Sequence, residues 1–116
     1  MNRGEVWWTE AAGARRPYLI LTRQAAIPIL HSLLAVPATR TIRDIPTQIE
    51  LDESDGMPEA CALSLDNLTL VPKPRFASRI CTLGPDKLSA TCAALGEAVD
   101  CLFPPSRAGG AVAAWR

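Results

Sequence analysis

Residues 15–22 read Arg-Arg-Pro-Tyr-Leu-Ile-Leu-Thr, and the interpretation of the whole chain starts from this stretch. Residues that favour β-structure follow a proline, which can open a strand but disrupts the hydrogen-bond ladder inside one. The stretch therefore predicts a buried strand with two guanidinium groups at its entry. A guanidinium stays charged at physiological pH, and its planar donors fit a phosphate. The alternative, which this stretch alone favours, is that Arg15 and Arg16 are solvated loop residues.

The composition is that of one ordinary globular domain. The chain has 116 residues, of which 48% are hydrophobic and 21% charged. Polar residues come directly after Met1, so no signal pattern is present, and no apolar run approaches the roughly 20 residues of a membrane span. We therefore expect a cytoplasmic protein without membrane contact.

Charge is unevenly distributed along the chain although the net charge is zero. Residues 1–43 contain six arginines and two glutamates, whereas residues 44–100 contain ten acidic and four basic residues. This separation predicts a basic face formed by the early strands and loops. It does not by itself establish nucleic-acid binding, because the acidic segment could fold over the basic one.

The cysteines and the single histidine do not form a metal-binding pattern. No Cys-x-x-Cys pair occurs, and His31 has no partner histidine, so we expect no metal site. There is no nucleotide-binding glycine loop, and we expect no bound cofactor. The pattern predicts buried free thiols at Cys61, Cys81, Cys92 and Cys101.

The hydrophobic pattern predicts a mainly β (α+β) domain over residues 1–103 and a flexible C-terminal tail over residues 104–116. Residues 10–15 are expected to form a loop. Apolar and β-branched runs predict six or seven short strands, at residues 4–9, 16–22, 32–36, 47–51, 59–65, 68–71 and 76–83. A C-terminal helix should begin at Pro85 and pack on a barrel-like sheet. Its expected apolar stripe is Leu88, Cys92, Leu95, Val99 and Leu102.

Several segments together resemble the MazF/PemK toxin family, the mRNA interferases of bacterial toxin–antitoxin modules. Each motif is short, but their order and spacing extend from residue 3 to about residue 103. The matching segments are Arg-Gly-Glu-Val-Trp at 3–7, Arg-Pro-Tyr-Leu-Ile-Leu at 16–21, Val-Pro-Ala-Thr at 36–39, Pro-Thr-Gln-Ile-Glu-Leu at 46–51, Ala-Leu-Ser-Leu-Asp-Asn-Leu at 62–68, and residues 79–88.

The resemblance implies an SH3-like β-barrel with a packed C-terminal helix, a homodimer, and a cognate antitoxin as partner. It implies sequence-specific, metal-independent cleavage of single-stranded RNA, with mRNA as the substrate and rRNA or tRNA left open. Arg16 and Thr39 match the catalytic pair of the family. The loop between the first two strands is shorter than is usual in the family, and Asn67 stands where glutamine is common.

Metal-free RNA cleavage uses the neighbouring 2′-hydroxyl as nucleophile. Two histidines often divide the proton transfers, and one subunit of this protein has only His31. The Arg16 guanidinium could stabilise charge on the phosphorane, while the Thr39 hydroxyl could donate to the phosphate or orient the 2′-hydroxyl. The alternative for Thr39 is a β-branched residue that merely ends a strand.

Further residues are candidates for RNA contacts. Trp7 and Trp8 project from opposite faces of one strand, so one should be core and the other could stack a base, for which Trp7 is the candidate. Base edges could be bound by Gln48 and Asn67, and phosphates by Arg15, Arg23, Arg40 and Arg43. Two other functions remain open: a CcdB-like non-catalytic toxin that poisons DNA gyrase, and a binding module in which Arg16 docks a partner's acidic tail.

Overall fold

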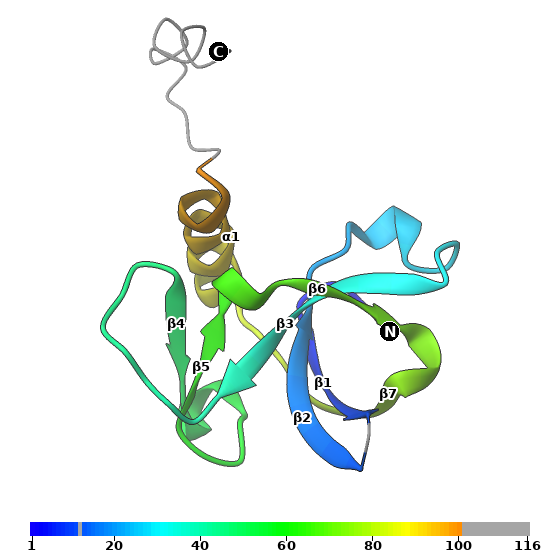
Figure 1. The fold of residues 1–116 in the computed structure, drawn as a ribbon, viewed down its shortest axis with the longest axis horizontal. Helices are drawn as coiled ribbons and strands as arrows, with labels where there is room; N and C mark the ends of the chain where they lie inside the picture. Colours follow the sequence, from blue (N-terminus) through cyan, green and yellow to red (C-terminus); the bar gives the residue numbers. More distant parts are fainter. Residues whose placement is uncertain (12, 101–116) are drawn as a thin grey trace, which may run out of the picture.

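The computed structural model describes residues 1–11 and 13–100 (Figure 1). The predicted tail and Leu102 lie outside these residues. Within them, seven strands precede one α-helix, and four short 3₁₀ turns connect the strands. The strands are β1 (Glu5–Ala11), β2 (Ala14–Ile20), β3 (Ser32–Thr39), β4 (Gln48–Leu51), β5 (Cys61–Ser64), β6 (Thr69–Pro72) and β7 (Phe76–Thr82). The helix is α1 (Pro85–Val99), and the turns are η1 (Gln24–Ala26), η2 (Glu53–Asp55), η3 (Leu65–Asn67) and η4 (Lys73–Arg75).

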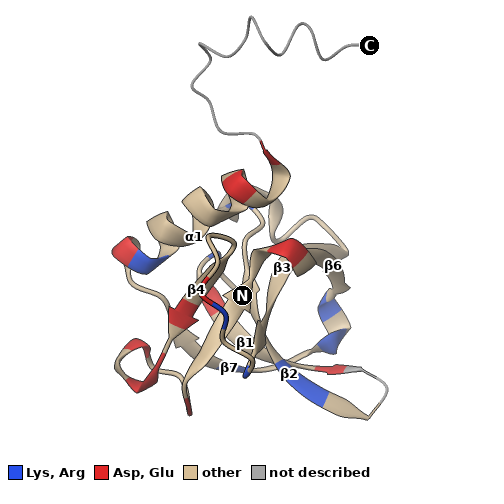
Figure 2. Cartoon of the chain, turned by 60° about the vertical axis from the view of Figure 1, so that its left-hand side comes forward, with Lys and Arg blue, Asp and Glu red and all other residues tan. Residues whose placement is uncertain are grey.

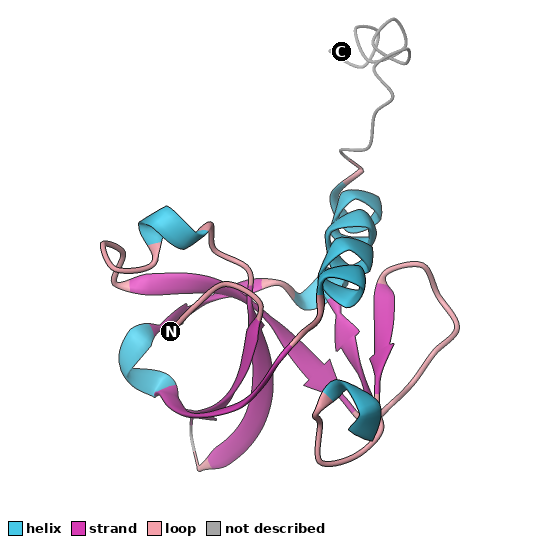
Figure 3. Ribbon diagram, turned by 180° about the vertical axis from the view of Figure 1, so that it is seen from behind, coloured by secondary structure: helices cyan, strands magenta, loops and turns pink. Residues whose placement is uncertain are grey.

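The strands form one strongly curved antiparallel sheet. The strand order is β4-β5-β3-β2-β1-β7, and β6 pairs with β3 off this path. The helix α1 lies against β4 and the η3 turn (Figure 3). The predicted mainly β domain with a C-terminal helix is thus confirmed. Its closure into a barrel stays a prediction, because no pairing in the described part of the chain joins the two end strands.

The first two strands form a longer hairpin than predicted. Pairing continues outward to Glu10 with Arg15 and to Ala11 with Ala14, so the expected loop at residues 10–15 is wrong. Gly13 explains the tight connection, because its φ of +79° lies in the left-handed region that glycine adopts without a Cβ penalty. The hairpin therefore projects from the sheet with Arg15 and Arg16 on its returning strand.

Both faces of the central strands are buried. Leu19 and Val36 face each other across β2 and β3 and belong to one core cluster. Ile20 and Ala35, the next pair, belong to a second cluster on the other face. All four residues are 0% exposed, as the continuous apolar run at residues 18–22 predicts.

The buried face of the helix overlaps the predicted apolar stripe only in part. Thr91 is fully buried and Leu88 and Leu95 pack on the first core cluster, but Val99 is 51% exposed. The Thr91 hydroxyl donates to the carbonyl oxygen of Lys87 at 2.8 Å, so a polar residue is buried without an unpaired group. The buried face is rotated from the predicted stripe toward Thr91 and Ala94, so residue 92 lies beyond its edge, and residue 99 is the last residue of the helix.

The thiol predictions are confirmed only in part. Cys61 is buried and Cys81 half-buried, but Cys92 is exposed on α1, so its predicted burial is wrong. Its sulfur accepts a hydrogen bond from Arg3 at 3.3 Å. Cys101 lies outside the described residues. No helix in the described residues is long and apolar enough to span a membrane.

A buried carboxylate holds the N-terminus on the sheet. Glu5 is 6% exposed, and its Oε1 accepts from the Asn2 backbone nitrogen at 2.8 Å and from Trp7 Nε1 at 2.9 Å. Its Oε2 accepts from Asn2 Nδ2 at 3.2 Å and lies 3.7 Å from Arg79 Nη1. Burial raises the pKa of the Glu5 carboxyl, but these hydrogen bonds and the N-terminal charge lower it further, so the pKa lies below its ordinary value of 4.5.

This network predicts a pH-dependent loss of stability. A carboxyl with a lowered pKa stabilises the fold above the unfolded-state value, and this contribution disappears as the pH falls through the folded-state value. We expect Glu5→Gln to lower the free energy of unfolding at pH 7 by about 1–3 kcal/mol. The difference from wild type should shrink at pH 4 and below, as measured by urea denaturation. Glu10→Gln, on the exposed hairpin, is the control, and a pH-independent Glu5→Gln effect would contradict the assignment.

Candidate active site

The candidate site begins where β2 and β3 separate. Their last paired residues are Tyr18 and Pro37, and beyond this point β3 pairs instead with β5, Thr39 being opposite Ala62. Counting two residues outward from the Tyr18–Pro37 pair reaches Arg16 on β2 and Thr39 on β3. Residues opposite one another in an antiparallel pair project from the same face. The predicted catalytic pair therefore lies at the mouth formed by the separating strands.

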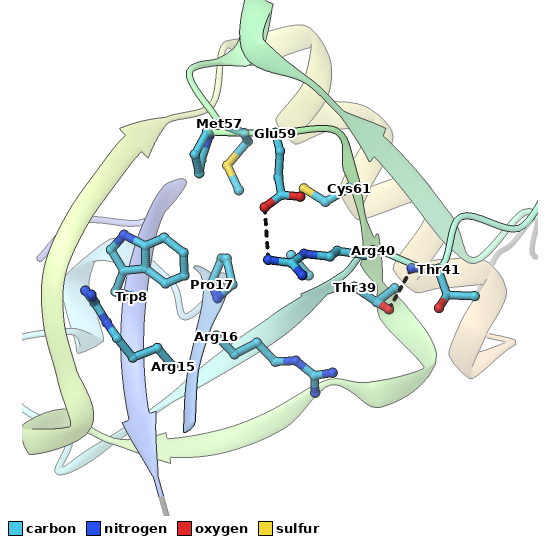
Figure 4. A pocket seen from close by; sticks show the side chains of 12 residues that line it. Trp8, Arg15, Arg16, Pro17, Thr39, Arg40, Thr41, Met57, Glu59 and Cys61 are labelled. Atoms are coloured by element: carbon cyan, nitrogen blue, oxygen red, sulfur yellow. Dashed lines mark hydrogen bonds and ion pairs between the residues drawn. The ribbon is translucent and has the colours of Figure 1, made fainter. Parts of the chain in front are cut away.

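Three hollows meet at Arg16. The first, of about 400 Å³, contains Trp8, Arg15, Arg40 and Glu59 in its lining, together with Pro17, Ala38, Thr41, Met57, Pro58 and Cys61 (Figure 4). The second, of about 310 Å³, is lined by Pro37, Thr41, Arg43, Ile45, Gln48, Ser64, Asp66 and Asn67. The third, of about 410 Å³, extends from β2 to η4. Arg16 lines all three, and Thr39 lines the first two.

Two of the three arginines that line the first hollow, Arg15 and Arg40, are already paired. Arg15 and Arg16 are successive strand residues, so their side chains project from opposite faces and diverge in Figure 4. The Arg15 guanidinium lies over the Trp8 ring at 4.8 Å, and its Nε is 3.6 Å from Glu10 Oε2. Arg40 Nη2 lies 3.1 Å from Glu59 Oε2. Both charges are therefore partly neutralised before any ligand binds.

Arg16 and Arg43 are not paired in this way. Neither forms an ion pair with any residue that the structure describes. Arg16 is held through its backbone, where its carbonyl oxygen accepts from the Thr9 hydroxyl at 3.1 Å. Its exposed guanidinium keeps all its donors for a ligand, which suits an anionic oxygen.

The Thr39 hydroxyl has a defined orientation. Its oxygen accepts from the backbone nitrogen of Thr41 at 3.1 Å. This bond occupies an acceptor position and leaves the hydroxyl hydrogen available for donation. Thr39 can therefore donate to a phosphate oxygen beside Arg16.

Gln48 holds the segment that carries Arg43. Its Oε1 accepts from the Arg43 backbone nitrogen at 2.6 Å, and its Nε2 donates to the Thr41 carbonyl oxygen at 3.2 Å. Both ends of the amide predicted to read a base edge are thus used to fix the segment over the second hollow. Asn67 lines the same hollow, and its Nδ2 donates to Ser64 Oγ at 2.8 Å.

Two predicted RNA-binding residues lie outside the three hollows. Trp7 packs edge-on against Phe76, with ring centroids 6.4 Å apart. The tryptophan that lines the first hollow is Trp8. Arg23 precedes η1, on another loop. The RNA contacts of Trp7 and Arg23 stay predictions. The pairing of β1 with β2 explains why Trp8 is the tryptophan at the first hollow. Trp8 is opposite Pro17, which lines that hollow, whereas Trp7 is opposite Tyr18.

Basic and acidic residues are concentrated on different strands of the sheet. Figure 2 shows Lys and Arg on β2 and on the turn after β6, and Asp and Glu on β4 and the turn that follows it. An unpaired arginine, a hydroxyl and further arginines thus lie around one mouth of the curved sheet, and guanidinium and hydroxyl donors are groups that suit a phosphate.

The chain belongs to the PemK-like, MazF-like toxin family of type II toxin–antitoxin systems, whose sequence pattern matches residues 2–99. It is similar to "Probable endoribonuclease MazF5" of Mycobacterium tuberculosis, with 42% identity over 101 residues, covering 85% of this chain and 93% of that protein. The family predicted from the motifs is thereby confirmed.

Solved structures show the same fold. "Mycobacterium tuberculosis toxin MazF-mt6" superposes with a TM-score of 0.77 at 28% identity, covering 83% of this chain and 96% of that one. A mycobacterial endoribonuclease in complex with its cognate antitoxin superposes with a TM-score of 0.82 at 24% identity, covering 90% and 99%. The second likeness concerns the fold alone.

The role of Gln48 predicts a local change in backbone protection. Gln48→Ala removes the acceptor of the Arg43 amide, so that amide should exchange with solvent about five- to ten-fold faster. Hydrogen-exchange NMR on the full chain measures this rate. Glu50→Ala, which alters an exposed side chain on the same strand, is the control. An unchanged Arg43 amide in Gln48→Ala would show that the side chain does not hold the segment.

Proposed function

We propose that this MazF-family endoribonuclease toxin cleaves single-stranded RNA at a short recognition sequence, without a metal ion, by attack of the 2′-hydroxyl on the adjacent phosphate. One observation carries the proposal: the unpaired Arg16 guanidinium and the Thr39 hydroxyl occupy one mouth between separating strands. The endoribonuclease name of the relative that is 42% identical supports the choice of RNA.

In this reaction the 2′-oxygen bonds to phosphorus and loses its proton, and the bond from phosphorus to the 5′-oxygen breaks as that oxygen gains a proton. The products are a 2′,3′-cyclic phosphate and a 5′-hydroxyl. Arg16 donates to the non-bridging oxygens, where negative charge increases in the transition state. Thr39 donates a further hydrogen bond. Arginine hardly deprotonates in proteins, so Arg16 stabilises charge and does not act as the base.

We expect RNA to bind more readily in the second hollow than in the first, because Arg43 is unpaired there. Arg43 takes a phosphate, and Asn67 offers its side-chain oxygen to a base edge. Trp8 offers a ring for stacking, but RNA entering the first hollow has to compete with Glu10 for Arg15 and with Glu59 for Arg40. The natural target is proposed to be mRNA, with rRNA or tRNA as the alternatives.

Two partners complete the proposal. A cognate antitoxin would cover the Arg16 mouth with a flexible acidic segment, which the unpaired arginines would attract. A second copy of the chain would form a homodimer. What supports the homodimer is an exposed apolar face where Leu34 and Leu70 oppose each other across β3 and β6, 41% and 62% exposed, with Ile29 76% exposed. The SH3-like barrel is proposed on the curvature of the sheet.

The proposal predicts cleavage that depends on Arg16. Purified full-length protein should cut a long RNA into discrete fragments in the presence of EDTA. Arg16→Ala should slow cleavage by about 10²–10³-fold, because a donor to the developing charge is lost. Lys73→Ala removes a positive charge outside the three hollows and should cleave at the wild-type rate. Single-turnover rates from gel analysis provide the measurement.

Thr39→Val separates the two interpretations of Thr39 in the same assay. It keeps the β-branched shape and removes the hydroxyl, so cleavage should fall. The hydrogen bond that the Thr41 backbone nitrogen donates to this hydroxyl is lost as well, which should lower the free energy of unfolding by only about 0.5–1.5 kcal/mol and leave the protein folded. If Thr39→Val cleaved RNA at the wild-type rate, the hydroxyl would have no part in the reaction and Thr39 would only end the strand. Absence of cleavage by the wild type, or equal cleavage by Arg16→Ala, would refute the proposed reaction. Gyrase inhibition without RNA cleavage would select the CcdB-like alternative.

A further inference from the structure

Apart from Arg16, the proposed reaction uses no side chain specific to the third hollow. It lies between the hairpin strand β2 and the η4 turn, with a volume of about 410 Å³, within the range of small-ligand sites. Its lining is Thr9, Ala14, Arg15, Arg16, Tyr18, Val71 and Arg75. Figure 2 shows the basic residues of η4 on the same side of the molecule as those of β2.

The charge of this lining favours an anion. The first hollow contains Glu59 and the second contains Asp66, whereas no carboxylate lines the third. Arg75 forms no ion pair with the residues that the structure describes, and neither does Arg16. Two uncompensated guanidinium groups therefore border the same hollow, and a phosphate is the anion that their planar donors fit.

The third hollow continues the candidate active site. Arg16 and Tyr18 are two residues apart on β2 and project from one face, and Thr9 is paired with Arg16. Arg16 thus borders both the second hollow, which contains Arg43, and the third, which contains Arg75. An RNA strand with its cleaved phosphate at Arg16 would have an unpaired guanidinium available in each of these two hollows.

We propose that the third hollow binds the nucleotide next to the cleaved phosphodiester on the side away from Arg43. Arg75 binds the phosphate of that nucleotide, and Tyr18 supplies the aromatic side chain against which its base lies. This subsite rests on the proposed function, because it takes Arg16 as the position of the cleaved phosphate.

The test compares Arg75→Ala with Lys73→Ala, which removes a like charge from the same η4 turn but outside the hollow. The probe is a single-stranded RNA of about 15 nucleotides that carries the mapped cleavage site with a 2′-deoxy substitution at the attacking nucleotide, so that it binds uncut. Fluorescence anisotropy of the full chain gives the affinity at several salt concentrations. We expect Arg75→Ala to weaken binding about ten-fold and to reduce the salt slope by about 0.7. Lys73→Ala should change the affinity less than about three-fold.

A truncation series locates the subsite. Removing nucleotides from one end of the probe should cost the wild type affinity while costing Arg75→Ala almost none, and truncation at the other end should affect both proteins equally. Equal affinities of Arg75→Ala and Lys73→Ala would overturn the proposal. So would unchanged RNA binding by Arg75→Ala with weakened antitoxin binding, which would assign the hollow to the antitoxin. Failure of the wild type to cut any RNA is seen earlier, in the mapping step, and refutes the proposed function itself.

Discussion

The separation of β2 from β3 after the Tyr18–Pro37 pair is the constraint on which the site depends. The register of these strands is fixed by packing on both faces of the sheet. Leu19 and Val36 pack in one core cluster, and Ile20 and Ala35 pack in the other. A slip by one residue would move every side chain of β2 to the other face and exchange the places of Arg15 and Arg16. Core packing therefore decides which of the two arginines meets Thr39.

Much of this arrangement could be predicted from the sequence, because proline and continuous apolar runs mark where strands enter a core. The hairpin and the two tryptophans could not. Alternation along β1 places Trp7 and Trp8 on opposite faces, but it does not show which face borders the first hollow; that depends on the tertiary pairing of Trp8 with Pro17 on β2. The helix face was also mispredicted, because a threonine with an internal hydrogen bond, Thr91, was buried in preference to Cys92.

Electrostatic pairing is the other feature that composition could not provide. The sequence shows an excess of arginine in residues 1–43, but only the fold brings Glu10 to Arg15 and Glu59 to Arg40. The unpaired guanidinium groups of Arg43 and Arg75 then border hollows that Arg16 also lines. Gln48 adds a second tertiary effect, because an amide that could read a base instead fixes the segment bearing Arg43. In the proposed reaction, charge stabilisation thus depends on which arginines the fold leaves unpaired.

The identity of the product ends tests the central claim most directly. Brief cleavage of a defined RNA by the full chain in EDTA, followed by mass spectrometry of the fragments, distinguishes the attacking nucleophile. Attack by the 2′-hydroxyl, with Arg16 and Thr39 stabilising the phosphorane, predicts 2′,3′-cyclic phosphate and 5′-hydroxyl ends. Fragments with 3′-hydroxyl and 5′-phosphate ends would mean that water attacks instead, and would contradict the mechanism assigned to this site.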